Sequence, residues 1–375
     1  MGNLIVFRSF CMELSDQLPF SLKVENFIDR AVRLKVTNNC PFSCEFCHNE
    51  GTELPERSGS RISTMIDPSL QSFNPIEDVS VPDIEGSLGY SQGAIDMSSL
   101  AFLKQLGFEQ IHLTGGEPSS HQHLPAIIRF LRQNSFTVKM TSNGQFSEEK
   151  LRKFVEAGLS GITFSILSLD AGEFLKTQLR QFDSQITAIV YAQKALKKVR
   201  DNIVRAQELG LVVKINVVIL STDDTARVDR IIDFARQYKV TINLLPCVLS
   251  SSSDACDKQS MEVLACRYAV SRGAHYVKTT RSTNNSGGTH HFVFPDGTLL
   301  GVKFIQNKQP ELLCASCEYY GKPSCSENFY GLRIEIRGGK PFVRLCVQKS
   351  TSQTLMPLES FVHSPLAELA PGIMQ

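Results

Sequence analysis

Three cysteines lie within the short segment CPFSCEFC, at Cys40, Cys44 and Cys47. Four thiolates complete the coordination of an iron–sulfur cluster, so three leave one iron of a [4Fe–4S] cluster open to a small molecule. A structural zinc ion takes four ligands, and His48 follows Cys47 too directly to swing round to the same ion. The spacing therefore favours an open cluster over zinc, and over buried cysteines that bind no metal.

A second group of cysteines lies near the C-terminus. Cys314 and Cys317 form a C-x-x-C pair, and Cys325 and Cys346 follow at longer intervals. Four cysteines at such spacings fit tetrahedral zinc or a second iron–sulfur cluster. We favour an auxiliary [4Fe–4S] cluster because the first group already indicates iron–sulfur chemistry.

The elements that must position these residues alternate regularly. The sequence predicts strands at 31–38, 109–114, 136–144, 161–167, 212–220 and 240–248 and helices at 99–107, 124–135, 147–159, 171–209 and 225–239. Such alternation predicts an α/β fold with a parallel sheet and helices outside. About six strand–helix units are too few for a complete barrel, so we expect a partial (β/α)6 TIM barrel.

The chain divides into three regions by this pattern. Residues 1–30 form an N-terminal extension, residues 31–249 the partial barrel, and residues 250–375 a small C-terminal domain carrying the auxiliary cluster. The Ser-, Pro- and Gly-rich segment 51–98 is either an insertion that covers the site as a lid or a disordered loop. We favour the lid because the segment directly follows the first cysteines.

Composition excludes several classes of protein. The 375 residues carry a formal net charge of +1, which argues against a general nucleic-acid binder. The longest apolar stretches, such as 210–220, are too short to cross a membrane, and the N-terminus lacks a secretory signal. We expect a cytoplasmic protein.

The motifs together resemble those of the radical S-adenosylmethionine (SAM) superfamily. VTNNCPFSCEFCHNEG resembles its cluster loop, and LTGGEP (113–118) and TSNG (141–144) resemble its turns after the second and third strands. The resemblance implies a [4Fe–4S] cluster whose open iron chelates SAM, reductive cleavage of SAM, and a 5′-deoxyadenosyl radical that abstracts hydrogen. It also implies a set of SAM-binding residues: Phe46, Gly115, Gly116, Glu117, Pro118, Ser142 and Asn143.

Within the superfamily, the chain resembles the GTP 3′,8-cyclases of molybdenum cofactor synthesis (MoaA-like enzymes). Residues 158–174 resemble their fourth-strand segment, which places Ser165 on a SAM-contacting serine. Arg33, Lys214 and Arg333 fall on positions that contact or accompany the substrate, so we take these three as catalytic candidates. Residues 299–317 and 332–346 resemble the auxiliary cluster region (SPASM/twitch-like), whose three ligands correspond to Cys314, Cys317 and Cys346; Cys325 is additional.

Departures from the cyclases concern the substrate. Basic positions of the cyclases here read Gln110, His112 and Gly331, an acidic one reads Leu167, and the last strand, INLLP, carries no charge. Because charged contacts hold phosphate groups, these losses argue against GTP itself. We therefore expect a relative that acts on another nucleotide- or nucleoside-like molecule, by cyclisation or C–C bond formation in natural-product or cofactor biosynthesis.

Two other functions stay open. A peptide-modifying radical SAM maturase also carries auxiliary clusters, and a non-catalytic iron–sulfur or zinc protein would cleave no SAM. The resemblance further implies a low-potential electron donor such as flavodoxin or ferredoxin. A basic helical region from Lys194 to Arg205 is either a solvated face or a docking surface for an acidic partner.

Overall fold

A computed structural model describes most of the chain. The described residues are 18–42, 44, 47, 87–90, 93–177, 185–219, 225–246, 258–322, 325, 328–347, 349 and 351–372. Phe46, His48 and most of the 51–98 insertion lie outside them. The lid therefore stays a prediction, and only a hairpin of β3 (Ser87–Tyr90) and β4 (Gly93–Asp96) is described there.

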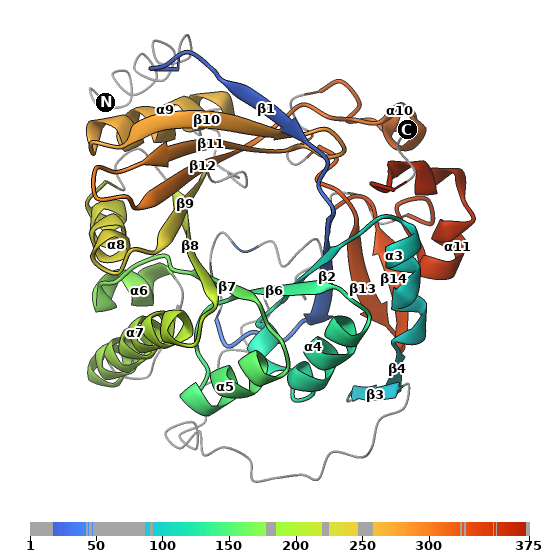
Figure 1. The fold of residues 1–375 in the computed structure, drawn as a ribbon, viewed down its shortest axis with the longest axis horizontal. Helices are drawn as coiled ribbons and strands as arrows, with labels where there is room; N and C mark the ends of the chain where they lie inside the picture. Colours follow the sequence, from blue (N-terminus) through green and yellow to red (C-terminus); the bar gives the residue numbers. More distant parts are fainter. Residues whose placement is uncertain are drawn as a thin grey trace.

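Six parallel strands form the predicted partial barrel. In spatial order they are β9 (Thr241–Pro246), β8 (Val212–Ile219), β7 (Gly161–Ser165), β6 (Thr137–Ser142), β5 (Gln110–Gly115) and β2 (Ala31–Thr37). Each neighbouring pair is parallel. Figure 1 shows these strands as a curved wall with the helices on its outer side. The α/β class and the partial barrel are confirmed.

The connecting helices follow from amphipathic patterns. They are η3 (Ser98–Ala101), α3 (Phe102–Gln105), η4 (Pro118–Ser120), α4 (Leu124–Gln133), α5 (Glu148–Glu156), α6 (Ala171–Thr177), α7 (Gln185–Glu208) and α8 (Thr225–Gln237). Helix α4 buries Ile127, Ile128 and Leu131, and the Ser147 side chain caps α5 by accepting from Lys150 N. In the described part of the chain, no helix is both long and apolar enough to span a membrane.

Strands from the C-terminal half, together with β1 near the N-terminus, extend the same sheet on both edges. Beyond β9 lie β12 (Leu299–Ile305), β11 (Gly287–Val293), β10 (His275–Ser282) and β1 (Val24–Phe27); beyond β2 lie β13 (Arg333–Arg337), β14 (Lys340–Arg344) and β15 (Leu355–Pro357). Strand β12 runs parallel to β9 and β13 runs parallel to β2, so both barrel edges are covered. The residues predicted as a small domain therefore also build the barrel wall.

Helices complete the C-terminal half: α9 (Lys258–Ser271), α10 (Glu311–Cys314), α11 (Leu358–Val362) and η5 (Pro365–Leu369). Helix α9 begins soon after the serine run at 250–253. It buries Met261, Val263, Ala265 and Cys266, so tertiary packing rather than local composition fixes it.

Candidate functional site

The first cysteine loop lies directly after β2, at the carboxyl end of the parallel strands. Cys40 and Cys44 are half-buried and Cys47 is exposed, and Cys47 N donates to Cys44 O over 3.2 Å. Burial raises the pKa of the Cys40 thiol to about 12, with smaller contributions from Glu117 and Cys47, against a hydrogen bond from Phe42 N to Cys40 Sγ. Because the charge of Cys47 contributes to the raised pKa of Cys40, the two cysteines are close enough to interact electrostatically.

Two glycines let the turn after β5 pack against this loop. Gly116 N donates to Thr37 O over 2.8 Å, and Glu117 N donates to Asn39 O over 2.7 Å. A Cβ atom on Gly115 would lie 2.2 Å from Thr37 O, and one on Gly116 would lie 2.2 Å from Asn39 O. The two positions require glycine because two backbones meet there, one of which leads into Cys40.

Replacing Gly116 with alanine is expected to lower the free energy of unfolding by about 1–3 kcal/mol, since its methyl group would overlap a backbone oxygen. Urea unfolding measures the change. Gly172→Ala is the matched control, because its added methyl group meets only the Asp170 side-chain oxygen at 3.3 Å. Equal stability of the two variants would contradict the packing role.

A buried carboxylate joins the turns after β5 and β6. Glu117, 2% exposed, accepts from Ser142 Oγ at 2.7 Å, Asn143 N at 2.7 Å and Ser119 N at 3.0 Å. Burial raises the pKa of Glu117, while these donors oppose the shift. The Asn143 Nδ2 group in turn faces Cys40 Sγ at 3.9 Å. The motifs predicted to bind SAM thus form one polar network beside the cysteine loop.

Other polar side chains line the barrel interior at the same end. Ser165, exposed at the end of β7, is in register with Asn216, whose Oδ1 accepts from Asn243 Nδ2 at 3.0 Å. Thr114 Oγ1 is buried and has no hydrogen-bond partner in the described part of the protein. Sequence analysis missed Thr114, Asn216 and Asn243, although each is a polar residue within a predicted barrel strand.

The interior of the barrel is positively charged. Lys214 on β8 lowers the pKa values of Lys139, His291 and Lys303, in each case after the larger effect of burial. The pKa of Lys303 falls to about 8, and Arg33 also contributes, although Asp29 opposes the shift. Lys303 Nζ donates to Thr289 Oγ1 over 2.8 Å. The charges of Lys214 and Arg33, which belong to different strands, therefore both act on the pKa of Lys303.

The structure brings two of the three catalytic candidates together. Arg33 on β2 is in register with Arg333 on β13, and their guanidinium carbons lie 4.6 and 5.4 Å from the centre of the Tyr330 ring. Arg333 is 4% exposed. Lys214 and Arg33 both act on the charge of Lys303, so Lys214 lies in the same interior as Arg33, beside which Arg333 is placed.

The second cysteine group also gathers in space. Cys317 N donates to Cys314 O over 2.9 Å, and burial followed by Cys325, Cys346 and Cys317 raises the pKa of Cys314 to about 11. All four thiols are half-buried. The additional cysteine of the sequence analysis, Cys325, therefore lies with the other three.

The donor atoms of both cysteine groups fit an iron–sulfur cluster, because soft thiolates are its usual ligands. Within the described ranges, no group of three His, Cys, Asp or Glu side chains is arranged around a single metal ion. The unpartnered Thr114 hydroxyl beside the glycine turn leaves a polar group for a small molecule.

Solved structures similar to this chain include the Streptococcus suis protein SuiB bound to S-adenosylmethionine and native anSMEcpe with bound AdoMet. The SuiB structure is 12% identical with a TM-score of 0.49, covering 91% of this chain and 67% of that one. The anSMEcpe structure is 9% identical with a TM-score of 0.47, covering 91% of this chain and 82% of that one.

Sequence comparisons agree with the motifs. GTP 3′,8-cyclase of Aquifex aeolicus is 31% identical over 60% of this chain, and a probable GTP 3′,8-cyclase of Methanocella arvoryzae is 27% identical over 57% of it. In both cases the match spans 56% of the relative's own length. The family model described as the radical SAM superfamily matches residues 34–235. Because that match spans more than half of the chain and includes the cysteine loop and both polar turns, the chain belongs to the radical SAM superfamily.

Proposed function

We propose that the chain is a radical SAM enzyme that abstracts hydrogen from an anionic, nucleotide-like molecule and promotes its cyclisation or C–C bond formation in natural-product or cofactor biosynthesis. The observation that carries this proposal is the position of the cysteine loop and its polar network at the mouth of a cation-lined barrel. The relatives named GTP 3′,8-cyclase support a nucleotide-like substrate.

The cluster and SAM would be held by separate residues. Cys40, Cys44 and Cys47 would ligate a [4Fe–4S] cluster, which supplies the electron that breaks a carbon–sulfur bond of SAM when both are bound. Gly115, Gly116, Glu117, Pro118, Ser142, Asn143 and Ser165 would hold SAM. The resemblance adds Phe46 to this set. Cys314, Cys317, Cys325 and Cys346 would hold the auxiliary cluster, with either three or four ligands.

The substrate proposal depends on charge in the barrel. Arg33, Lys214 and Arg333 are retained from the cyclase-like pattern, and the interior adds Lys139 and Lys303. A cluster of cations lowers the pKa of its own members unless an anion neutralises it. The loss of basic residues at Gln110, His112 and Gly331 predicted a less positive interior, but Lys139 and Lys303 add positive charge to it. We propose that this interior holds a phosphate-bearing substrate.

Cys44→Ala is expected to abolish SAM cleavage, because the remaining two thiolates do not fix a cluster with one open iron. The protein is reconstituted anaerobically with iron and sulfide, given SAM and dithionite, and assayed for 5′-deoxyadenosine by mass spectrometry. Cys266→Ala, which removes a buried thiol of α9, is the control and should retain wild-type formation. A cluster-loaded wild-type protein that neither binds nor cleaves SAM would overturn the proposed function.

A further inference from the structure

The inner face of helix α7 packs directly on the first cysteine loop. Ala192, Ala195 and Leu196 of α7 form a small apolar cluster with Phe42 and Phe174, against which Cys40 and Cys44 are packed. The rings of Phe42 and Phe174 meet edge to face at 5.4 Å. Gln145 Nε2 also donates to Ala195 O over 3.1 Å. One side of α7 therefore forms a wall of the cysteine site.

The outer face of the same helix is exposed, basic and partly apolar. Val190, Tyr191, Lys194, Lys197 and Lys198 recur at helical intervals of three and four, so they share one side of α7. All five are exposed, Val190 at 44% and Tyr191 at 37%. Two large apolar side chains, Val190 and Tyr191, are therefore exposed beside three lysines on this face.

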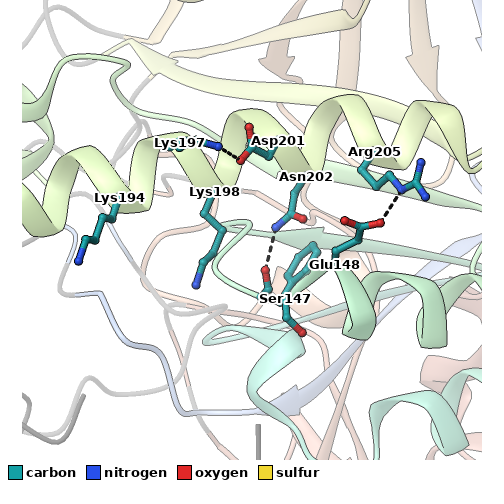
Figure 2. A pocket seen from close by; sticks show the side chains of 9 residues that line it. Ser147, Glu148, Lys194, Lys197, Lys198, Asp201, Asn202 and Arg205 are labelled. Carbon is teal, nitrogen blue, oxygen red and sulfur yellow. Dashed lines mark hydrogen bonds and ion pairs between the residues drawn. The ribbon is translucent and has the colours of Figure 1, made fainter. Parts of the chain in front are cut away.

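A cavity of about 320 Å³ lies beside the lysines, between α7 and the start of α5. Figure 2 shows Lys194 and Lys198 projecting from α7 on one side, whereas Lys197 is directed along the helix toward Asp201. Asp201 pairs with Lys197 at 2.6 Å, and Glu148 pairs with Arg205 at 2.9 Å. The ion pairs of the described lysines and arginines at this cavity are those of Lys197 and Arg205, and neither involves Lys194 or Lys198. The charges of Lys194 and Lys198 are therefore available to a partner.

We propose that this outer face of α7, defined by Val190, Tyr191, Lys194, Lys197 and Lys198, docks an acidic one-electron carrier protein of the flavodoxin type. The inference rests on the proposed function, which requires one electron for each SAM cleaved. A helix is about 10 Å across with its side chains. A carrier bound to the outer face would therefore be separated from Cys40 and Cys44 by the width of α7. One electron leaves the reduced carrier and reduces the cluster by one electron; no atom or proton is transferred.

The charge pattern supports this occupant over a second copy of the chain. Two copies facing each other through α7 would bring the unpaired lysines together, and like charges across an interface repel. An acidic carrier would instead neutralise them, and complementary charge accelerates encounter between proteins. The exposed Val190 and Tyr191 would then form the apolar centre of the interface.

Binding of a purified acidic flavodoxin to the protein without cluster tests the surface directly. Isothermal titration should show binding that weakens from low to physiological ionic strength, ~0.15 M. In K194E/K198E the dissociation constant should rise about tenfold or more. The control R129E/K340E, which changes net charge equally at exposed sites on α4 and the β13–β14 hairpin, should bind like the wild type. No binding by the wild type, or equal binding by K194E/K198E, would overturn the proposal.

A second measurement separates docking from chemistry. With reduced flavodoxin as donor, K194E/K198E should raise the KM for flavodoxin by about tenfold. With dithionite, a small reductant that needs no docking surface, its rate of 5′-deoxyadenosine formation should equal that of the wild type. Unchanged KM for flavodoxin in this variant argues against the site. A wild type inactive even with dithionite would count against the proposed function, whereas the titration would still test docking.

Discussion

Glu117→Ala is expected to reduce SAM-dependent formation of 5′-deoxyadenosine by about a hundredfold while leaving the iron content of the reconstituted protein close to that of the wild type. The carboxylate receives hydrogen bonds from Ser119, Ser142 and Asn143, and these fix the turn after β6 against the turn after β5. Without Glu117, three donors lose their acceptor. Each buried donor left unpaired costs about 1–3 kcal/mol, so the two turns would move apart to find other partners.

Glu109→Ala is the matched control for this prediction. Glu109 immediately precedes β5 but is exposed, and its ion pair with Arg30, at 3.6 Å, is a surface contact. It should therefore keep wild-type activity and stability. Both variants are assayed with dithionite and compared by urea unfolding, which separates a loss of chemistry from a loss of fold. A Glu117→Ala protein that cleaves SAM at the wild-type rate would exclude an essential role for the carboxylate network.

The barrel strands could be predicted from the sequence because their alternating pattern is local. In β6, Val138 and Met140 face the helices, while Lys139 and Thr141 face the interior. Parallel strands end at a common edge, and the turns at Glu117 and Ser142, both assigned to SAM binding, meet there. Their exact contacts, however, depend on which residues of neighbouring strands stand side by side, and that register is not local.

The role of Gly115 and Gly116 shows this limit. Sequence analysis assigned the glycines to close approach by SAM, whereas the structure also gives them a packing role against Thr37 and Asn39. That contact joins residues almost eighty positions apart in the chain. No periodicity in either segment indicates it, so only the folded sheet brings the two backbones together.

The cationic interior was only partly predicted for the same reason. Lys214 and Arg33 were found by resemblance, but Lys303 lies in a segment assigned to a separate C-terminal domain. Because β12 pairs with β9, Lys303 lies on a strand next to the barrel strands. Lys139 carried a signal that could have been used, since it is the charged residue at an inward position of a strand with buried Val138 and Met140 on its other face.

Lys303 leads to the second large effect, a pH-dependent affinity for phosphate-bearing ligands. Its pKa is lowered to about 8 by burial and by the charges of Lys214 and Arg33, with Asp29 opposing them. Lys303 is therefore charged below that pH and loses its charge as the pH rises through it. An anion binds the charged form, so the affinity of the wild type for GTP and for inorganic tripolyphosphate should fall between about pH 7 and about pH 9.

Lys303→Met should remove both the charge and this pH dependence. At about pH 7 the loss of one charged hydrogen bond, worth about 1.5–3 kcal/mol, weakens binding of either ligand by about ten- to a hundredfold. As the pH rises above about 8, the affinities of the variant and the wild type should approach each other, because the wild-type lysine loses its charge. Isothermal titration at about pH 7 and about pH 9 measures the effect, with the exposed Lys340→Met as control. A pH profile in Lys303→Met as steep as that of the wild type would assign the titration to another group, and unchanged affinity at about pH 7 would place the anion elsewhere in the molecule.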